Sequence, residues 1–345
     1  MTEITAGIFD NYNGIDIQIF TIQSKNIVAN VLTYGALLQS LFVPDKNGAF
    51  DDVTTGFDNI EDYNNKGRKD GSIMGRYAGR ISNASFSLND QEYELFKING
   101  DPPKHSIHGG QFGFHTKIWT PKIITNGVEL TYISEDMEEG YPGTLTVTIT
   151  YEVVENELKI TYKAVTDKDT VINLTNHAYF NLDGHSNWGK LNRHEIRIPS
   201  DFVLETDDES IPTGEFIDVS RTAFDLRNGV LLTDQILGFV PGSNGYDHTY
   251  VLKTEASSVE KLAARVESFS SGRVMEVYTT QPSVQFYTAN IFTGQVGKEG
   301  VVYEKQSCLA LETQFFPDSP NRPEFPSTVL TPDSEFFETA RFVFF

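Results

Sequence analysis

The sequence predicts an all-β protein: one large, antiparallel β-sandwich with few and short helices. Apolar and polar residues alternate with period two in many segments, and turn-forming residues separate these segments. No window of about 15 residues keeps a helical period. Aromatic residues make up 12% of the chain, with 25 Phe and 15 Tyr, which also favours strands.

The clearest strands are two consecutive segments in the middle of the chain. Residues 145–151 (LTVTITY) place apolar side chains on one face and threonines on the other. After the polar turn at Glu155 and Asn156, residues 158–164 (LKITYKA) repeat this pattern. The two segments therefore predict an antiparallel hairpin with one buried face.

Other elements follow from the same pattern. A second hairpin is expected at 85–88 and 93–97, joined by Asn89 and Asp90, and a third at 273–278 and 283–288. Gln281 and Pro282 separate the last two segments, and proline marks the start or break of a strand. Short helices are expected at 58–64 and 233–237.

Composition predicts one domain that spans residues 1–345. The 27 Gly and 14 Pro are spread along the chain and indicate no linker. The net charge of −21 argues against nucleic acid and membrane surfaces as partners. The chain has one cysteine, Cys308, no leader-like N-terminus and no long apolar run, so a cytoplasmic location is expected.

Polar residues interrupt strand-like apolar runs in five segments, which are therefore candidate functional sites. Two of them carry the most informative residues. His177 lies among strand-forming residues, where a buried imidazole needs partners. Glu312 lies within an apolar strand, where burial of a carboxylate is costly unless donors or a ligand meet it. A structural histidine and a buried ion pair are the alternative interpretations. The five segments are 75–80, 105–110, 173–182, 245–248 and 311–314.

Metal and cofactor motifs are missing from the sequence. His105, His108 and His115 lie close together, but their spacing matches no helix-borne pair, and no cysteine or carboxylate pattern completes a metal site. There is no nucleophile elbow, phosphate-binding loop or dinucleotide fingerprint. We therefore expect neither a metal nor a cofactor, and the residues alone indicate a β-rich enzyme with histidine and glutamate in a cleft.

Taken together, the segments resemble the galactose mutarotase (aldose 1-epimerase) family. The resemblance runs in order along nearly the whole chain, from YGA (34–36) through GRI (79–81) to the C-terminal strand. Its most specific motifs are NHAYFNL (176–182), QPSVQFYT (281–288) and ETQFFPDSPN (312–321). The resemblance implies a galactose mutarotase-like supersandwich that holds the sugar in an open cleft.

The resemblance also implies residue roles for a ring-opening reaction that interconverts α and β anomers of galactose, glucose and similar free aldoses. Glu312 would be the general base and His177 the general acid. His108 would be a second histidine at the ring oxygen. The implied substrate-binding residues are Arg80, Asp247 and Gln281, and we add Asn176, the neighbour of His177.

The chain departs from the family pattern at one position, and two other functions are possible on the same fold. Many members of the family read Ala-Asn-Arg where this chain has Gly79 before Arg80, which leaves the sugar preference open. A hexose-6-phosphate 1-epimerase would need several basic residues at the cleft to bind phosphate. A non-catalytic carbohydrate-binding protein would lack either the histidine or the glutamate. We expect a monomer or a homodimer.

Overall fold

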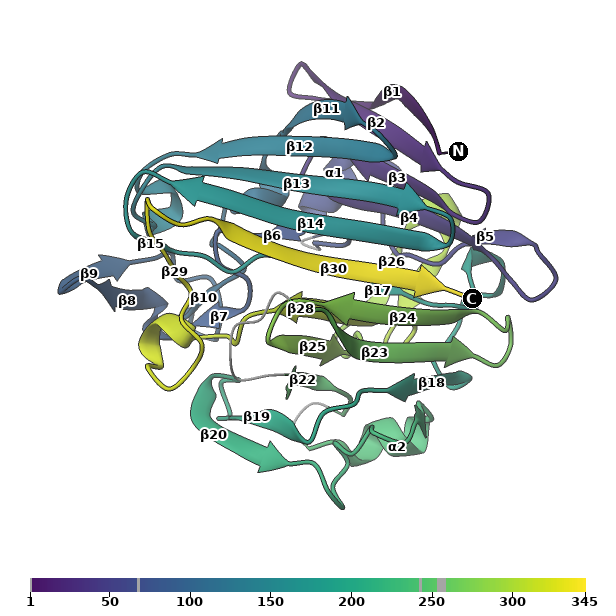
Figure 1. Ribbon diagram of the computed structural model, residues 1–345. Coiled ribbons are helices and arrows are strands. Elements are labelled where there is room, and N and C mark those ends of the chain that lie inside the picture. Colours follow the sequence, from purple (N-terminus) through teal and green to yellow (C-terminus); the bar gives the residue numbers. More distant parts are fainter. Residues whose placement is uncertain (1, 67–68, 242–243, 253–258) are drawn as a thin grey trace.

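The computed structural model describes residues 2–66, 69–241, 244–252 and 259–345, and the regular secondary structure of these residues is mostly antiparallel strands. The strands form sheets of nine, six and five strands and several two-stranded ribbons (Figure 1). This confirms the predicted all-β sandwich. No helix among the described residues is long and apolar enough to cross a membrane.

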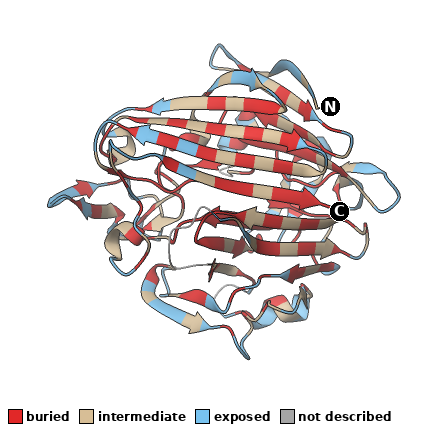
Figure 2. Ribbon diagram, viewed as in Figure 1, coloured by how far each residue is buried: buried red, intermediate tan, exposed pale blue. Residues whose placement is uncertain are grey.

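The nine-stranded sheet contains the clearest predicted hairpin. Its strands β13 and β14 pair from Leu145↔Thr166 to Val154↔Glu157, and buried and half-buried residues alternate along both (Figure 2). The apolar residues of the alternation face the core, as expected. The order of strands is β11 (Thr120–Ile124), β12 (Gly127–Ser134), β13 (Leu145–Val154), β14 (Glu157–Thr166), β30 (Phe336–Phe344), β24 (Val274–Thr279), β23 (Lys261–Ser268), β18 (His194–Arg197) and β21 (Val230–Leu231).

The six-stranded sheet has a strand that is buried on both faces. All six residues of β28 are buried, including the polar ones at its C-terminal end. A strand inside the molecule can carry polar side chains only where these find partners or line a cavity. The order is β17 (Tyr179–Phe180), β28 (Leu309–Gln314), β25 (Ser283–Tyr287), β22 (Asp247–Val251), β19 (Phe202–Thr206) and β20 (Pro212–Asp218).

The remaining strands form a five-stranded sheet and five two-stranded ribbons. The five-stranded sheet is β1 (Glu3–Tyr12), β2 (Ile15–Gln23), β3 (Val28–Leu32), β4 (Leu37–Pro44) and β5 (Phe50–Asp52). The ribbons pair β6 (Ile73–Met74) with β16 (Thr175–Asn176), β7 (Arg80–Ile81) with β10 (Ser106–Ile107), β8 (Ser85–Leu88) with β9 (Gln91–Glu94), β15 (Thr170–Val171) with β29 (Val329–Leu330), and β26 (Thr293–Val296) with β27 (Val302–Glu304).

The two predicted short helices are present with side-chain caps. Helix α1 (Ile60–Asn65) begins after Asn59, which accepts a hydrogen bond from the Asp62 amide. Helix α2 (Asp234–Phe239) begins after Thr233, which accepts one from the Ile236 amide. Such caps satisfy amides that the first turn leaves without partners.

Two predicted hairpins differ from the structure. The partner of β8 is β9 at Gln91–Glu94, earlier than the expected 93–97. Strands β24 and β25 do form near the expected 273–278 and 283–288, but they do not pair with each other. Strand β24 pairs with β23 and β30, whereas β25 pairs with β22 and β28. The connection at 280–282 crosses from one sheet to the other.

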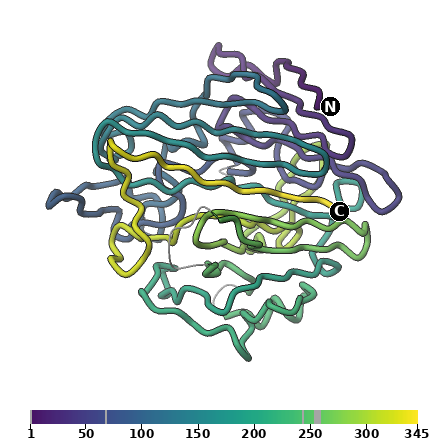
Figure 3. Tube along the Cα trace, viewed as in Figure 1, coloured from purple at the N-terminus to yellow at the C-terminus, as the bar shows by residue number. Residues whose placement is uncertain are grey.

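One core joins the three large sheets. Buried side chains from all three of these sheets form the main apolar cluster, which includes Val31, Ile149, Val277, Phe286 and Leu311. The C-terminal strand β30 runs between β14 and β24, so that the end of the chain is built into the middle of the nine-stranded sheet (Figure 3).

Candidate active site

Glu312 is the most buried acidic group of the candidate site. It lies in β28 opposite Gln285 of β25 and is only 3% exposed. Its Oε2 makes no hydrogen bond within the described part of the chain. Burial first, and then the negative charge of Asp247, raise the pKa of Glu312 to about 8, while Arg80 and Lys69 act in the opposite direction.

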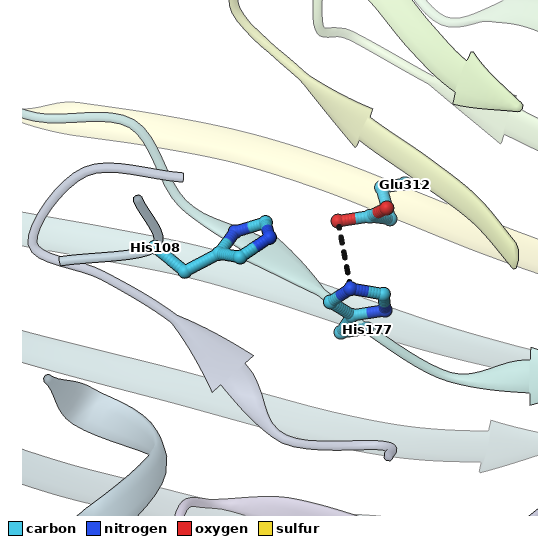
Figure 4. A group of neighbouring side chains, drawn as sticks. All are labelled: His108, His177 and Glu312. Atoms are coloured by element: carbon cyan, nitrogen blue, oxygen red, sulfur yellow. Dashed lines mark ion pairs between the residues drawn. The ribbon is translucent and has the colours of Figure 1, made fainter. Parts of the chain in front are cut away.

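His177 faces the Glu312 carboxylate. Its Nε2 lies 3.7 Å from Glu312 Oε2, too far for a hydrogen bond but close enough for both groups to contact one small ligand (Figure 4). The backbone of His177 is fixed on both sides, because its amide donates to Ser72 and its carbonyl accepts from Gly71, each at 2.9 Å. Its ring stacks on Tyr179 with centroids 4.8 Å apart.

The third group is His108, which directly follows β10. Its ring centre lies 5.2 Å from that of His177. The Gly79 amide donates to His108 Nδ1 at 3.3 Å, so that a neutral ring carries its proton on Nε2. Burial and the nearby positive groups, Lys69 foremost among them, hold the pKa of His108 well below its usual range. His108 is therefore a neutral hydrogen-bond donor.

The His-Gly-Gly motif depends on its first glycine. Gly109 has a φ of +84°, and a Cβ there would lie 1.8 Å from the Gly75 carbonyl oxygen. Any side chain would push the His108 loop away from the segment that carries Arg80. This close approach explains why the motif needs glycine next to the histidine.

Asp247 forms a polar row with two residues that the sequence analysis missed. Gln285 Nε2 donates to Asp247 Oδ1 at 2.6 Å, and Thr249 Oγ1 donates to Gln285 Oε1 at 2.5 Å. All three line the cavity. Thr249 lies on the same face of β22 as Asp247, so that period-two alternation extended from Asp247 would have identified it. Gln285 lies opposite Thr249 on the neighbouring strand β25, and only the pairing of these two strands brings it to the row.

Arg80 of β7 also lines the cavity. Its Nε donates to Asn99 Oδ1 at 3.1 Å, and its backbone pairs with Ile107 next to His108. The cavity has a volume of about 450 Å³, large enough for a small polar ligand. Besides the residues named so far, it is lined by aromatic and basic side chains, among them Tyr179, Tyr287, Phe292, Lys66 and Lys69.

Two predicted substrate-binding residues lie outside this lining. The Gln281 amide donates to the carbonyls of Leu174 and Thr313, and the Asn176 amide donates to the Gly71 carbonyl and the Tyr151 hydroxyl. Both side chains thus hold the backbone around His177 and Glu312. This placement favours a supporting role for Gln281 and Asn176, and Gln285 takes the position on the cavity wall.

The structure separates the histidines that are close in sequence. His105 Nδ1 accepts from the Asn83 amide and is not part of the cavity lining. The groups that do come together are His108, His177 and Glu312, whose nearest ligand atoms all lie within 4.8 Å of one another. Two imidazoles and a carboxylate are also suitable zinc ligands, so that this trio can serve either acid–base chemistry or a metal ion.

Comparisons with known proteins agree with the fold and the motifs. The family model described as aldose 1-epimerase matches residues 18–342. The chain is 42% identical to human galactose mutarotase, with coverage of 100% of this chain and 99% of the relative, and 34% identical to the aldose 1-epimerase of Haemophilus influenzae, with 92% of each covered. The crystal structure of an aldose epimerase homologue from C. elegans superimposes with a TM-score of 0.85 at 28% identity, covering 99% of both chains.

Proposed function

The chain belongs to the aldose 1-epimerase family and is an isomerase that interconverts the anomers of free aldoses, and we propose that Glu312, His177 and His108 carry out this reaction. Opening of the cyclic hemiacetal needs a proton to leave the C1 hydroxyl while another reaches the ring oxygen. Reclosure on the other face reverses both transfers after rotation about C1–C2. A base and an acid that face one ligand are sufficient for this.

Glu312 is the proposed base. Its buried Oε2, with no hydrogen bond among the described residues, is an acceptor that a sugar hydroxyl can satisfy. A pKa near 8 means that the carboxyl group is largely protonated at pH 7 in the empty cavity and ionises as the pH rises. A hydroxyl that donates to the carboxylate favours the ionised form.

His177 is the proposed acid, and His108 a donor to the ring oxygen or to a neighbouring hydroxyl. His177 is the ring that faces Glu312 across the cavity, so that both can act on one hemiacetal. His108 is neutral and offers an Nε2 proton for hydrogen bonding. Asp247, Gln285 and Arg80 supply charged and polar groups that match the hydroxyls of an aldose away from C1.

The juxtaposition of Glu312 and His177 carries this proposal, and polarimetry tests it. Freshly dissolved α-galactose and α-glucose should mutarotate faster with the protein than without it. The variant Glu312→Gln should lower kcat by about 10²–10⁴-fold. Its melting temperature should stay close to that of the wild type. Near-normal turnover of the Gln variant would show that Glu312 is not the base. Activity that a chelator removes and zinc restores would assign the trio to a metal ion.

Several further features complete the proposal. A single domain is supported by the continuous core. We also expect a cytoplasmic protein that works without cofactor, as a monomer or a homodimer.

Glucose 6-phosphate belongs in the same polarimetric assay, because the hexose-6-phosphate alternative predicts that it is the better substrate. A non-catalytic binding protein would accelerate none of the three sugars.

A further inference from the structure

One wall of the cavity belongs to a hairpin that stands apart from the large sheets. Its strands β26 and β27 pair only with each other among the described residues, and they lie in the chain between β25 and β28. We call residues 291–305 the hairpin segment. Three of its side chains line the cavity: Ile291, Phe292 and Gln295. Since no large sheet holds this wall, other contacts must fix its position.

Lys298, at the tip of the hairpin segment, reaches into the interior and is only 3% exposed. Its Nζ donates to Asp52 Oδ2 at 2.6 Å, to the Gln39 carbonyl at 2.5 Å and to Thr54 Oγ1 at 3.3 Å. Its backbone amide donates to the Gly56 carbonyl at 3.0 Å. All four partners lie in β4, in β5 or shortly after β5. Lys298 therefore joins the hairpin segment to the five-stranded sheet.

The Asp52 carboxylate is held in place by its own sheet. Its Oδ1 accepts from the amides of Leu41 and Thr54 at 3.1 and 3.0 Å, and Asp52 is 5% exposed. A buried ion pair adds little net stability, because both charges lose their hydration. Its best-attested use is to select one arrangement of the chain. The pair of Lys298 with Asp52 thus determines where the tip of the hairpin segment lies.

Two other contacts hold the hairpin segment, and both are at the surface. Lys66 Nζ donates to the Val296 carbonyl at 2.7 Å, and the Glu299 amide donates to Asp58 Oδ2 at 3.0 Å. Water can replace such exposed hydrogen bonds at little cost. The buried contacts of Lys298 are therefore the ones whose loss should release the segment.

The anchor of Lys298 and the cavity side chains refer to the same strand. The Thr55 amide, close to Asp52 in the chain, donates to the Tyr179 carbonyl at 3.0 Å. The Tyr179 ring contacts the His177 ring, with centroids 4.8 Å apart, and the Phe292 ring, with centroids 5.1 Å apart. The hairpin segment is thus set in position relative to the proposed acid.

We propose that Lys298 is a positioning residue for sugar binding, which fixes the hairpin segment as a wall of the cavity. Lys298 is not part of the described cavity lining, so it acts through Phe292 and Gln295. An aromatic ring packs against the C–H groups of an aldose, and an amide can hydrogen-bond to its hydroxyls. This inference rests on the proposed function, because it takes an aldose as the ligand of the cavity.

Loss of the anchor should weaken sugar binding more than turnover. In Lys298→Met the sugar must itself order the side chains of the wall, which should raise KM by about three- to tenfold. The base in β28 and the backbone of His177 are held by hydrogen bonds outside the hairpin segment. We therefore expect kcat to change by less than about twofold.

The experiment compares kcat and KM for α-galactose in the wild type, in Lys298→Met and in a double variant that also carries Asp52→Asn. The asparagine keeps the Oδ1 acceptor but removes the buried charge that Lys298→Met leaves unpaired. The double variant should therefore regain stability towards urea while its KM stays raised, and it serves if the single variant folds poorly. Lys305→Met, which removes an exposed lysine of the same segment, is the matched control and should keep the wild-type KM.

An unchanged KM in Lys298→Met and in the double variant would overturn the inference. A KM that returns to the wild-type value together with the stability of the double variant would also overturn it, because the pair would then serve stability alone.

Hydrogen exchange provides a readout that needs neither sugar nor turnover. The amides of residues 293–304 should exchange faster in Lys298→Met and in the double variant than in the wild type, whereas those of β13 and β14 should not. Unchanged exchange in the hairpin segment overturns the inference even if the enzyme is active. A wild type without mutarotase activity would instead refute the proposed function, and the exchange rates would still decide whether Lys298 holds the segment.

Discussion

At the scale of single residues, two imidazoles that lie side by side have different electrostatic surroundings. His108 accepts a hydrogen bond from the Gly79 amide and stays neutral, whereas His177 lies against the Glu312 carboxylate. We expect His177→Asn to lower kcat by about 10²–10⁴-fold, because it removes the proton donor. His108→Asn keeps a donor and should cost about tenfold.

Polarimetric kcat values for the two variants measure this difference. Circular dichroism serves as the control for folding, since both side chains are packed in the cavity wall. Equal losses in both variants, with the same pH dependence, would contradict the assignment of His177 as the acid.

Asp247 acts on both the sugar and the base, so that its removal should produce two separate effects. Asp247→Ala should cost about 1.5–3 kcal/mol of transition-state binding, or roughly ten- to 150-fold in kcat/KM, by an amount that differs between galactose and glucose. Loss of its negative charge should also lower the pKa of Glu312 and displace the acidic limb of the profile of kcat/KM against pH to lower pH.

The measurement is kcat/KM for both sugars over the pH range of the acidic limb. Gln285→Leu is the matched control, since it removes the hydrogen bond to Asp247 but leaves the carboxylate in place. The same fractional loss for every aldose, without any displacement of the limb, would assign Asp247 to structure.

The sequence predicted the site residues that lie in recognisable motifs. It missed the residues that come near these motifs only through the tertiary structure. Glu312, His177 and His108 stand in recognisable strings and meet in one cavity. Lys69 also lines this cavity, but it lies in a loop with no alternation, and backbone bonds between residues 71–72 and His177 hold that loop in place. No local pattern encodes such a contact between distant segments.

At the scale of elements, period-two alternation identified strands but not their partners. The pairing of β13 with β14 was predictable because a short turn joins them. Strands β24 and β25 are also close in sequence, yet each pairs with strands from elsewhere in the chain. Alternation fixes which side chains face the core, whereas pairing depends on the packing of the two sheets against each other.

Arg76 shows how a buried side chain connects these elements. It is 2% exposed, and its guanidinium donates to the carbonyls of Pro142 and Gly143 and to the hydroxyls of Ser134 and Thr170. Arg76→Met would leave several buried acceptors without donors, each at a cost of about 1–3 kcal/mol. We expect the free energy of unfolding to fall by at least about 3 kcal/mol.

Urea denaturation followed by fluorescence measures this loss. Arg193→Met is the matched control, because the Arg193 guanidinium donates to Ser270 at the exposed surface and its removal should change stability little. Similar stabilities of the Arg76 variant and the wild type would show that water or neighbouring groups replace the guanidinium.

At the scale of the whole molecule, the net charge of −21 contrasts with the basic side chains that line the cavity. The overall field repels anions, and salt screens it over roughly 8–10 Å at ordinary ionic strength. A neutral aldose feels neither effect. We therefore expect kcat/KM for galactose to change less than about twofold between low and high salt.

Glucose 6-phosphate should behave differently, because its phosphate must approach against the same field. We expect its kcat/KM to be well below that of galactose at low salt and to rise by several fold as salt screens the repulsion. Polarimetry of both sugars over a series of sodium chloride concentrations measures this, with viscosity matched as the control. If glucose 6-phosphate were the better substrate at low salt, the local charges of Lys66, Lys69 and Arg80 would outweigh the field of the molecule. The hexose-6-phosphate alternative would then be the correct description of its specificity.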